Sequence, residues 1–164
     1  MPIRKAIWNS MLDADMNTRY WKYLVYRYSR RDTTLKIFLA VMTSGTVAGW
    51  GIWVELAYIW KMLSSLSALL AIALPILNYP KKIESMAELS GKWGELLFEY
   101  EDLWLEVDNN PSPNTLNKNY RKFRTTEKSL VKKETKLPTD KRLIDKCQIE
   151  VNKSRGLQLR NKNE

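Results

Sequence analysis

Two stretches of this chain contain no charged residue, and each is long enough to cross a lipid bilayer as a helix. Residues 37–54 form an uncharged run of eighteen, and residues 62–80 form one of nineteen. An α-helix rises 1.5 Å per residue, so eighteen residues span about 27 Å, close to a bilayer's hydrocarbon core of roughly 30 Å. We therefore expect an all-α membrane protein in which residues 37–80 form a two-span transmembrane helical hairpin, with spans at about 37–54 and 62–79.

The competing interpretation is a pair of helices buried in the core of a soluble protein. A chain of 164 residues is about the size of one domain, and its core seldom holds two such long charge-free helices side by side. We therefore favour lipid as the surroundings of both stretches.

Charge is distributed unevenly along the chain. Lys and Arg number 27 and Asp and Glu 18, a formal net charge of +9. Residues 1–36 carry a net charge of +5, residues 37–80 zero, residues 81–114 −5 and residues 115–164 +9. A long neutral block between charged flanks is typical of a membrane segment.

Basic and aromatic residues predict the orientation in the membrane. Four Trp and Tyr residues cluster around the turn between the two spans, namely Trp50, Trp53, Tyr58 and Trp60. Basic residues precede the first span and follow the second, whereas the turn has no basic excess. The positive-inside rule then places both termini in the cytoplasm, so we expect a multi-pass protein of the cell inner membrane. Residues 1–36 lack the continuous apolar stretch of a signal peptide.

Small and hydroxylated residues recur within the two predicted spans. The helix-packing candidates are small residues at helical spacing: Gly45, Gly49, Ser64, Ala68 and Ala71. They could pack the two spans together in a monomer or pack spans of different subunits, and the sequence leaves both possibilities open. Because one hairpin cannot enclose an aqueous path, a pore needs several copies. Its candidate lining residues are Thr43, Ser44, Thr46 and Glu55.

The flanking segments predict cytoplasmic helices. Residues 1–36 read as a basic amphipathic helix, with a bend expected at Asp32 and Thr33 before the first span. Residues 81–108 read as an acidic helix with apolar residues at alternating steps of four and three. This predicted seam contains Met86, Ser90, Trp93, Leu97, Tyr100 and Trp104. Its expected partner is the N-terminal helix, whose charge is opposite; self-association between subunits is the alternative.

Residues 115–156 predict a basic helical region in two parts, followed by a polar tail at 157–164. A break at 135–137 separates the two helices, and the second presents Leu143, Ile144, Cys147 and Val151 on one face. This region suits contact with acidic lipid headgroups or with a protein. Direct nucleic-acid binding is not favoured, because the segment lacks interleaved aromatic residues and the pattern of a nucleic-acid-binding fold.

The composition gives no sign of an enzyme. The chain has no histidine and one cysteine, which excludes a histidine base, the common zinc sites and a disulfide scaffold. No phosphate-binding glycine loop is present. We expect no catalytic residues, no metal and no cofactor.

The order of these parts resembles the SLATT domain family of bacterial two-span proteins. Three stretches carry the resemblance: RYSRRDTTLKIFLAV, the pattern E-x-x-x-E-L-x-x-x-W-x-x-L-x-x-x-Y-x-x-L-W from Glu84 to Trp104, and LPTDKRLIDKCQIEVNKSRGL. The similarity of layout covers most of residues 15–157. The family occurs with nucleotide-sensing and phage-defence systems and has no invariant catalytic residues.

The resemblance implies an oligomeric effector that forms a pore or disrupts the inner membrane, in anti-phage defence by abortive infection. The chain shows no sensor domain of its own, which points to a separately encoded sensor or partner protein as the source of the signal. The alternative is a membrane anchor or scaffold that recruits a soluble partner through residues 81–164. A holin-like lysis protein fits less well, because holins need little beyond their spans.

Overall fold

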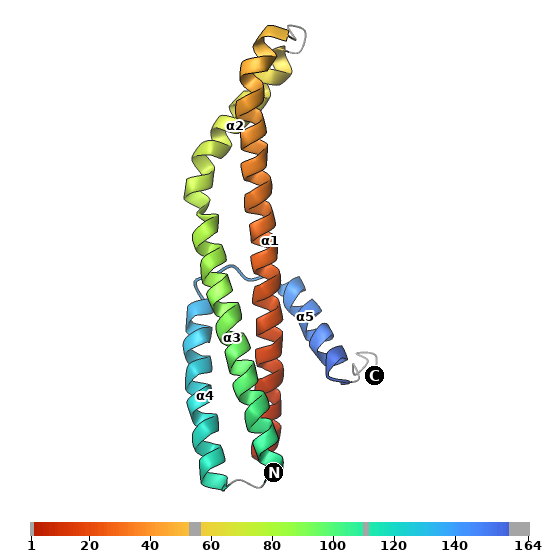
Figure 1. Ribbon diagram of the computed structural model, residues 1–164, viewed down its shortest axis with the longest axis vertical. Helices are drawn as coiled ribbons and strands as arrows, with labels where there is room; N and C mark the ends of the chain where they lie inside the picture. The colour runs from red at the N-terminus through yellow and green to blue at the C-terminus, as the bar shows by residue number, and fades with distance from the viewer. Residues whose placement is uncertain (1, 53–56, 110–111, 158–164) are drawn as a thin grey trace. The chain divides into compact units, whose positions relative to one another are not determined.

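The computed structural model describes residues 2–52, 57–109 and 112–157, and these form α-helices joined by short turns. The helices are α1 (Pro2–Ile52), α2 (Ala57–Leu77), α3 (Tyr79–Asp108), α4 (Pro113–Glu134) and α5 (Lys141–Ser154). No strand occurs among the described residues, so the predicted all-α class is confirmed for them. Figure 1 shows the helices in chain order.

The chain divides into two compact units, and helices α1 and α3 contribute to both. One unit, here called the bundle, consists of Met1–Leu24 and Ser85–Glu164. The other, here called the hairpin unit, consists of Val25–Glu84.

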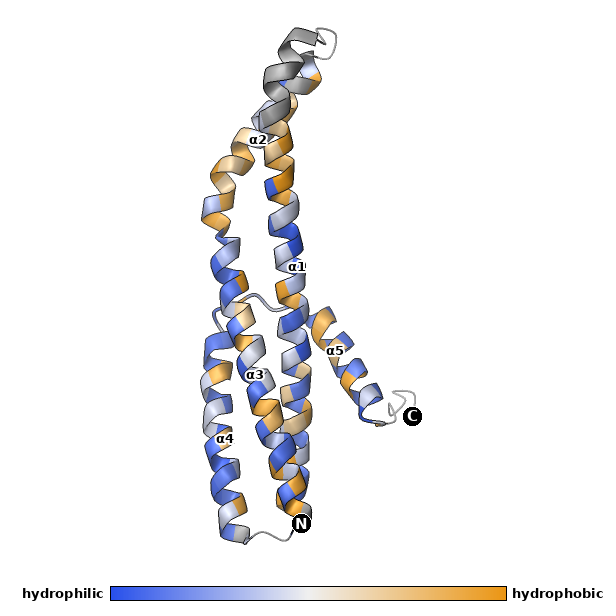
Figure 2. Ribbon diagram, in the orientation of Figure 1, coloured by the Kyte–Doolittle hydropathy of each residue, from blue (hydrophilic) through white to orange (hydrophobic). Residues whose placement is uncertain are grey.

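In the hairpin unit, α2 runs antiparallel to the second half of α1 (Figure 1). The rings of Tyr28 and Tyr79 meet edge to face, with their centroids 5.8 Å apart, and the Arg31 guanidinium lies over the Tyr28 ring. The Tyr28 and Tyr79 rings, with their polar hydroxyl tips, thus lie together beside a cation, the arrangement favoured at a membrane interface. Figure 2 shows that both helices of the unit are rich in apolar residues.

The expected bend at Asp32 and Thr33 is wrong, because α1 continues as a helix from Pro2 to Ile52. Asp32 accepts a hydrogen bond from Lys36, four residues further on, and such pairs stabilise a helix. Neither proline nor glycine occurs near this point to interrupt the backbone. The basic N-terminal helix and the first predicted span therefore belong to one element.

Asn78 separates α2 from α3. Its φ of 46° lies in the left-handed region, which asparagine tolerates better than most residues. Two residues later, Pro80 has no backbone N–H and cannot donate the hydrogen bond that would extend α2. The Asn78 amide itself still donates to the Leu74 carbonyl at 3.2 Å. The helix thus ends and restarts within one residue, and α3 begins two residues before the expected start at residue 81.

The bundle has an apolar core contributed by all four of its helices. Residues of the first half of α1 and of α3 supply most of it, and α4 and α5 cover it with Leu116, Leu130, Leu143, Cys147 and Val151. The expected pairing of the N-terminal helix with α3 is present. The rings of Trp8 and Trp104 lie 5.1 Å apart, and the Ser90 hydroxyl donates to the Thr18 carbonyl at 3.3 Å.

The buried seam of α3 differs in register from the predicted one. Its buried residues again alternate in steps of three and four, and they are Met86, Leu89, Trp93, Leu96, Tyr100 and Leu103. Met86, Trp93 and Tyr100 belong to both sets, whereas Leu97 and Trp104 are only partly buried. In this register Leu89, Leu96 and Leu103 enter the core in place of Ser90, Leu97 and Trp104. Burial of their apolar surface contributes about 25 cal/mol per Å².

Two carboxylates of α4 hold the aromatic residues of the core in place. Glu134 Oε1 accepts hydrogen bonds from the indole N–H groups of both Trp21 and Trp93, at 2.8 and 2.7 Å. Glu127 accepts from the Tyr100 hydroxyl at 2.9 Å and pairs with Arg124. Burial, followed by the charge of Glu127, raises the pKa of Tyr100. Each buried polar tip thus has an acceptor, as a low-polarity core requires.

Helix α5 is tied to the other helices at both of its ends. At its start, the Asp140 side chain accepts from the Leu143 amide, and the Asp140 amide donates to the Tyr20 hydroxyl at 3.0 Å. At its end, Arg155 pairs with Asp15 and Glu101. Gly156 follows with a φ of 67°, a conformation that ends helices and favours glycine.

Replacing Glu134 should weaken the bundle, because one oxygen serves two indoles that are almost fully buried. We expect Glu134→Leu to lower the free energy of unfolding by about 2–4 kcal/mol, since it leaves both indole donors unpaired. Glu134→Gln keeps an acceptor oxygen and should cost less. Urea unfolding of the detergent-solubilised protein, followed by tryptophan fluorescence, measures both, with Glu84→Gln as an exposed control. Equal stabilities of Glu134→Leu and the control would refute this role.

Cys147 should report on the docking of α5. Its thiol is fully buried, and burial raises its pKa, so both access and reactivity are low in the folded protein. We expect a maleimide reagent to label it at least about tenfold more slowly than in urea. Arg155→Ala, which removes the ties to Asp15 and Glu101, should speed labelling, whereas Lys153→Ala should not. Labelling as fast as in urea would show that α5 is undocked in solution.

Candidate functional site

The hairpin unit exposes many large apolar side chains. Those at least partly open to solvent on both helices are Ile37, Val41, Tyr58, Ile59, Met62, Leu66, Leu69, Ile72, Ile76 and Leu77. The most exposed, Ile76, has 78% of its surface open. In water, monomeric proteins rarely display an apolar area of this extent, so such a surface marks contact with a membrane or a partner.

Three hydroxyl groups of the hairpin unit donate hydrogen bonds within the helices that carry them. The hydroxyls of Ser65 and Ser67 each donate to the carbonyl four residues earlier, at 2.9 Å. The Thr43 hydroxyl donates to the Leu39 and Ala40 carbonyls. Hydroxyls bonded in this way do not oppose transfer of the helix into hydrocarbon. The site is therefore a surface suited to lipid rather than a cleft.

Among the described residues, one helical stretch is long and apolar enough to cross a membrane, Lys61–Val107. Only 6% of its most apolar window is buried within the protein, which distinguishes it from the core helix of a soluble domain. Membrane association therefore has the support of this stretch, and the apolar window corresponds to the second predicted span. The first predicted span ends in residues that the structure does not describe.

The predicted helix-packing residues fall into two groups. Gly45 and Gly49 lie in the helical backbone of α1, but their surroundings are outside the described part of the chain. On α2, Ser64 is half-buried, whereas Ala68 and Ala71 are exposed within the protomer. Neither alanine thus packs α2 onto α1.

The small residue that does pack there is Ser67, which also belongs to the small residues of the predicted second span. It is buried, and Leu63, Leu70 and Leu74 on the same face are half-buried. On α1, Met42 is buried. The spacing 63, 67, 70 and 74 follows one face of a helix and would have identified this stripe. Small residues occur on several faces of α2, so residue size alone did not select the right one.

The predicted pore-lining residues are only partly described. Thr43 is exposed, and its hydroxyl faces the helix backbone as given above. Ser44 and Thr46 lie in α1 with undescribed surroundings, and Glu55 lies outside the described residues. The pore-lining assignment of these four residues therefore stays a prediction.

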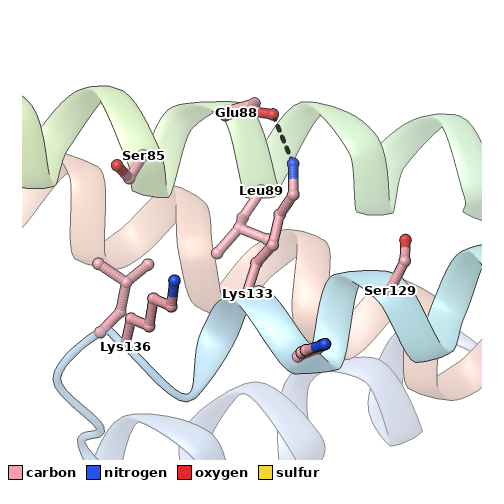
Figure 3. A pocket seen from close by; sticks show the side chains of 8 residues that line it. Ser85, Glu88, Leu89, Ser129, Lys133 and Lys136 are labelled. Atoms are coloured by element: carbon pink, nitrogen blue, oxygen red, sulfur yellow. Dashed lines mark hydrogen bonds and ion pairs between the residues drawn. The ribbon is translucent and has the colours of Figure 1, made fainter.

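A basic groove lies in the bundle between the start of α3 and the end of α4 (Figure 3). It has a volume of about 440 Å³, and its lining residues are Ser85, Glu88, Leu89, Ser129, Lys132, Lys133, Lys136 and Leu137. The Lys133 ammonium reaches across it to the Glu88 carboxylate at 3.0 Å, as Figure 3 shows. Hydrogen bonds from Lys92 and then Lys133 lower the pKa of Glu88 to about 2.

The groove offers positive charge but little enclosure. Lys132 and Lys133 lie in the last turn of α4, where cations stabilise the negative end of the helix dipole. They thus have a structural role without any ligand. Within the described residues, no group of three or more His, Cys, Asp or Glu side chains could hold a metal ion.

Comparison with family models, with curated proteins and with solved structures finds no match to this chain. The resemblance to the SLATT family stays a prediction. What the chain does must be argued from its surfaces.

A charge placed in the exposed apolar face should prevent stable membrane insertion. Leu69 lies near the middle of α2, and Leu69→Arg there should cost about 2.5–3.5 kcal/mol. We expect the fraction resistant to alkaline carbonate extraction to fall strongly. Ile149→Arg, on the exposed face of α5, should integrate like the wild type. Equal extraction of the two variants would contradict a lipid environment for α2.

Proposed function

We propose that the chain is an oligomeric inner-membrane effector that forms a pore or otherwise permeabilises the bilayer. The observation behind this proposal is the exposed apolar surface of the hairpin unit, which needs lipid or other protein to cover it. The small amount of burial within the apolar window of Lys61–Val107 points the same way. The proposal includes two spans, at about 37–54 and 62–79, with both termini in the cytoplasm.

Small residues that the protomer leaves uncovered support assembly. Ala68 and Ala71 are exposed on α2 and do not contact α1 closely. In a bilayer, helices associate through close packing of small residues, since lipid is as apolar as leucine. These two positions thus suit contacts between subunits, while Ser67 serves the contact within one.

The signal in this proposal comes from a separately encoded sensor or partner, and the role is anti-phage defence. Its support is the SLATT-like layout together with the bundle itself. The groove that the bundle offers between α3 and α4 is open and lined by lysines, whereas small molecules are typically buried in enclosed, largely apolar cavities. A macromolecular trigger therefore fits the bundle better than direct sensing of a nucleotide.

Permeabilisation gives the direct test. We expect the full chain, reconstituted in vesicles of phosphatidylethanolamine and phosphatidylglycerol, to release carboxyfluorescein in proportion to a high power of protein density, because several copies act together. Strong induction in cells should likewise collapse the membrane potential. A monomer in detergent that neither leaks dye nor depolarises cells at any density would refute the proposal.

In the same assays, Gly45→Leu and Gly49→Leu should reduce both oligomer mass and leakage, since leucine prevents close approach of two helices. The matched control is Ala40→Leu, an exposed small residue on a different face of α1. Unchanged mass and leakage in both glycine variants would remove this packing argument.

The alternative function is a membrane anchor or scaffold. It has its own support: the bundle contains more than half of the chain and is a well-packed folded unit, more than a pore of two-span subunits requires. An anchor should co-purify with one defined soluble partner and should leave vesicles intact. Leakage by the purified chain alone therefore decides between the two functions.

A further inference from the structure

Helix α3 presents an acidic face whose carboxylates form no ion pair or hydrogen bond with the described residues. The exposed acids along its second half are Glu95, Glu99, Asp102 and Glu106. None of these side chains forms an ion pair or a hydrogen bond with the residues that the structure describes. Between them lie Phe98 and Leu105, seven residues apart and 66% and 63% exposed. We call these six residues the acidic band.

Helix α4 presents the opposite charge. Its exposed basic residues include Lys118, Arg121, Lys122 and Lys128, here called the basic band. Over the described part of the chain, these four side chains also lack a carboxylate partner. The ion pairs of α4 use Arg124 and Lys133 instead.

Contacts in the core show that the two bands lie at the same level along the bundle. Tyr100, in the middle of the acidic band's sequence, packs against Tyr120 and Phe123 with ring centroids 6.2 and 5.7 Å apart. Its hydroxyl reaches Glu127. Residues 95–106 of α3 therefore run alongside residues 118–128 of α4.

The bands cannot neutralise each other within one protomer. The side of α3 that meets α4 is occupied by Tyr100 and the side of α4 by Phe123, while both bands are exposed to solvent. Each protomer thus has an unpaired acidic face and an unpaired basic face of matching height.

We propose that the acidic band of one copy docks on the basic band of the next, and that this contact joins the bundles of the oligomer. The inference rests on the proposed assembly and deepens it by naming the contact. Because the two faces differ, the contact is head-to-tail, and such contacts close into rings when the rotation per subunit allows. Neighbours in a membrane share one orientation, so bands at equal height meet directly.

The two exposed apolar residues fit this contact. Lysine and arginine carry aliphatic stems that cover apolar surface while the charged group reaches out. Phe98 and Leu105 would pack on the stems of the basic band, with the flanking carboxylates meeting the ammonium and guanidinium groups. A mixture of apolar packing and charge pairs is typical of a specific but reversible interface.

A second copy explains both bands, whereas an anionic bilayer explains only one. Acidic headgroups would attract the basic band but repel the four carboxylates and leave Phe98 and Leu105 uncovered. When one chain carries both bands, every assembly contains acidic and basic bands in equal numbers, so each band can find a partner. Lipid binding by the basic band is accordingly an outcome that the test must separate.

Charge reversal tests the contact. The acidic-band variant is Glu99→Lys with Asp102→Lys, the basic-band variant is Lys118→Glu with Lys122→Glu, and the third variant combines all four changes. Light scattering of the full chain in a mild detergent measures the mass. We expect each two-site variant to need at least about tenfold more protein to assemble. The substituted band then carries no net charge, and its two reversed residues repel the opposite band. The four-site variant should need less protein than either two-site variant, because reversed residues of the two bands again attract each other.

Mixing sharpens the result. The acidic-band variant keeps an intact basic band and the basic-band variant keeps an intact acidic band, so the two can join through one wild-type contact. We expect differently tagged forms of the two variants to co-purify although neither assembles alone. Raising the salt concentration to 1 M should weaken the wild-type assembly, since it shortens the screening length to about 3 Å.

Matched controls are Glu84→Lys with Asp145→Lys, and Lys141→Glu with Arg142→Glu, which change the net charge equally outside the bands. Their mass should not change. Slow labelling of Cys147 confirms that each variant is folded. Failure of the four-site variant and of the mixture to assemble would overturn the inference. So would unchanged mass in both two-site variants, including the case in which the basic-band variant loses only binding to phosphatidylglycerol vesicles.

Dye release separates this inference from the proposed function. If the charge reversals change mass as expected but the wild type never releases dye, the contact stands and the pore fails. If the wild type releases dye and the reversals leave mass unchanged, the pore stands and the contact fails.

Discussion

The exposed apolar surface of the hairpin unit is the constraint on which the rest of the molecule depends. A backbone in hydrocarbon must satisfy its own hydrogen bonds, so helices whose side-chain hydroxyls bond within the same helix suit such surroundings. Ser65, Ser67 and Thr43 do so. The same helices then continue into a bundle with the opposite requirement, an apolar core covered by charged faces. Helices α1 and α3 meet both conditions along one continuous backbone.

The bundle solves its own problem with a few well-placed acceptors. Large aromatic side chains supply much of the buried area, but Trp21, Trp93 and Tyr100 bring polar tips into the core. Glu134 and Glu127 accept hydrogen bonds from these tips. Directional hydrogen bonds, as well as apolar contacts, therefore fix the position of α4. Hydrogen bonds to a charged group are stronger than neutral ones, and they fix the register of α4 on the core.

The sequence predicted where the helices lie in the chain better than it predicted which face of each helix is buried. Some features depend on residues that are close together in the sequence, such as the helical neutral runs, the break near Pro80 and the capped start of α5. The structure has these features within a few residues of the expected positions. The seam of α3 depends on which of two adjacent apolar residues enters the core, as at Leu96 and Leu97 or at Leu103 and Trp104. A period of 3.5 fits both choices, and only the partner helix decides. On α2 likewise, small residues lie on several faces, and only the packing against α1 singles out the face of Ser67. The surroundings of Gly45 and Gly49 are not described.

The break at Asn78 makes the two routes through the chain mechanically unequal. Helix α1 runs from Pro2 to Ile52 without interruption. The return route from α2 to α3 has a single non-helical residue, Asn78, with Pro75 and Pro80 on either side of it. The dihedral angles of Asn78 can therefore change without interrupting a helix, whereas α1 offers no such position along its length.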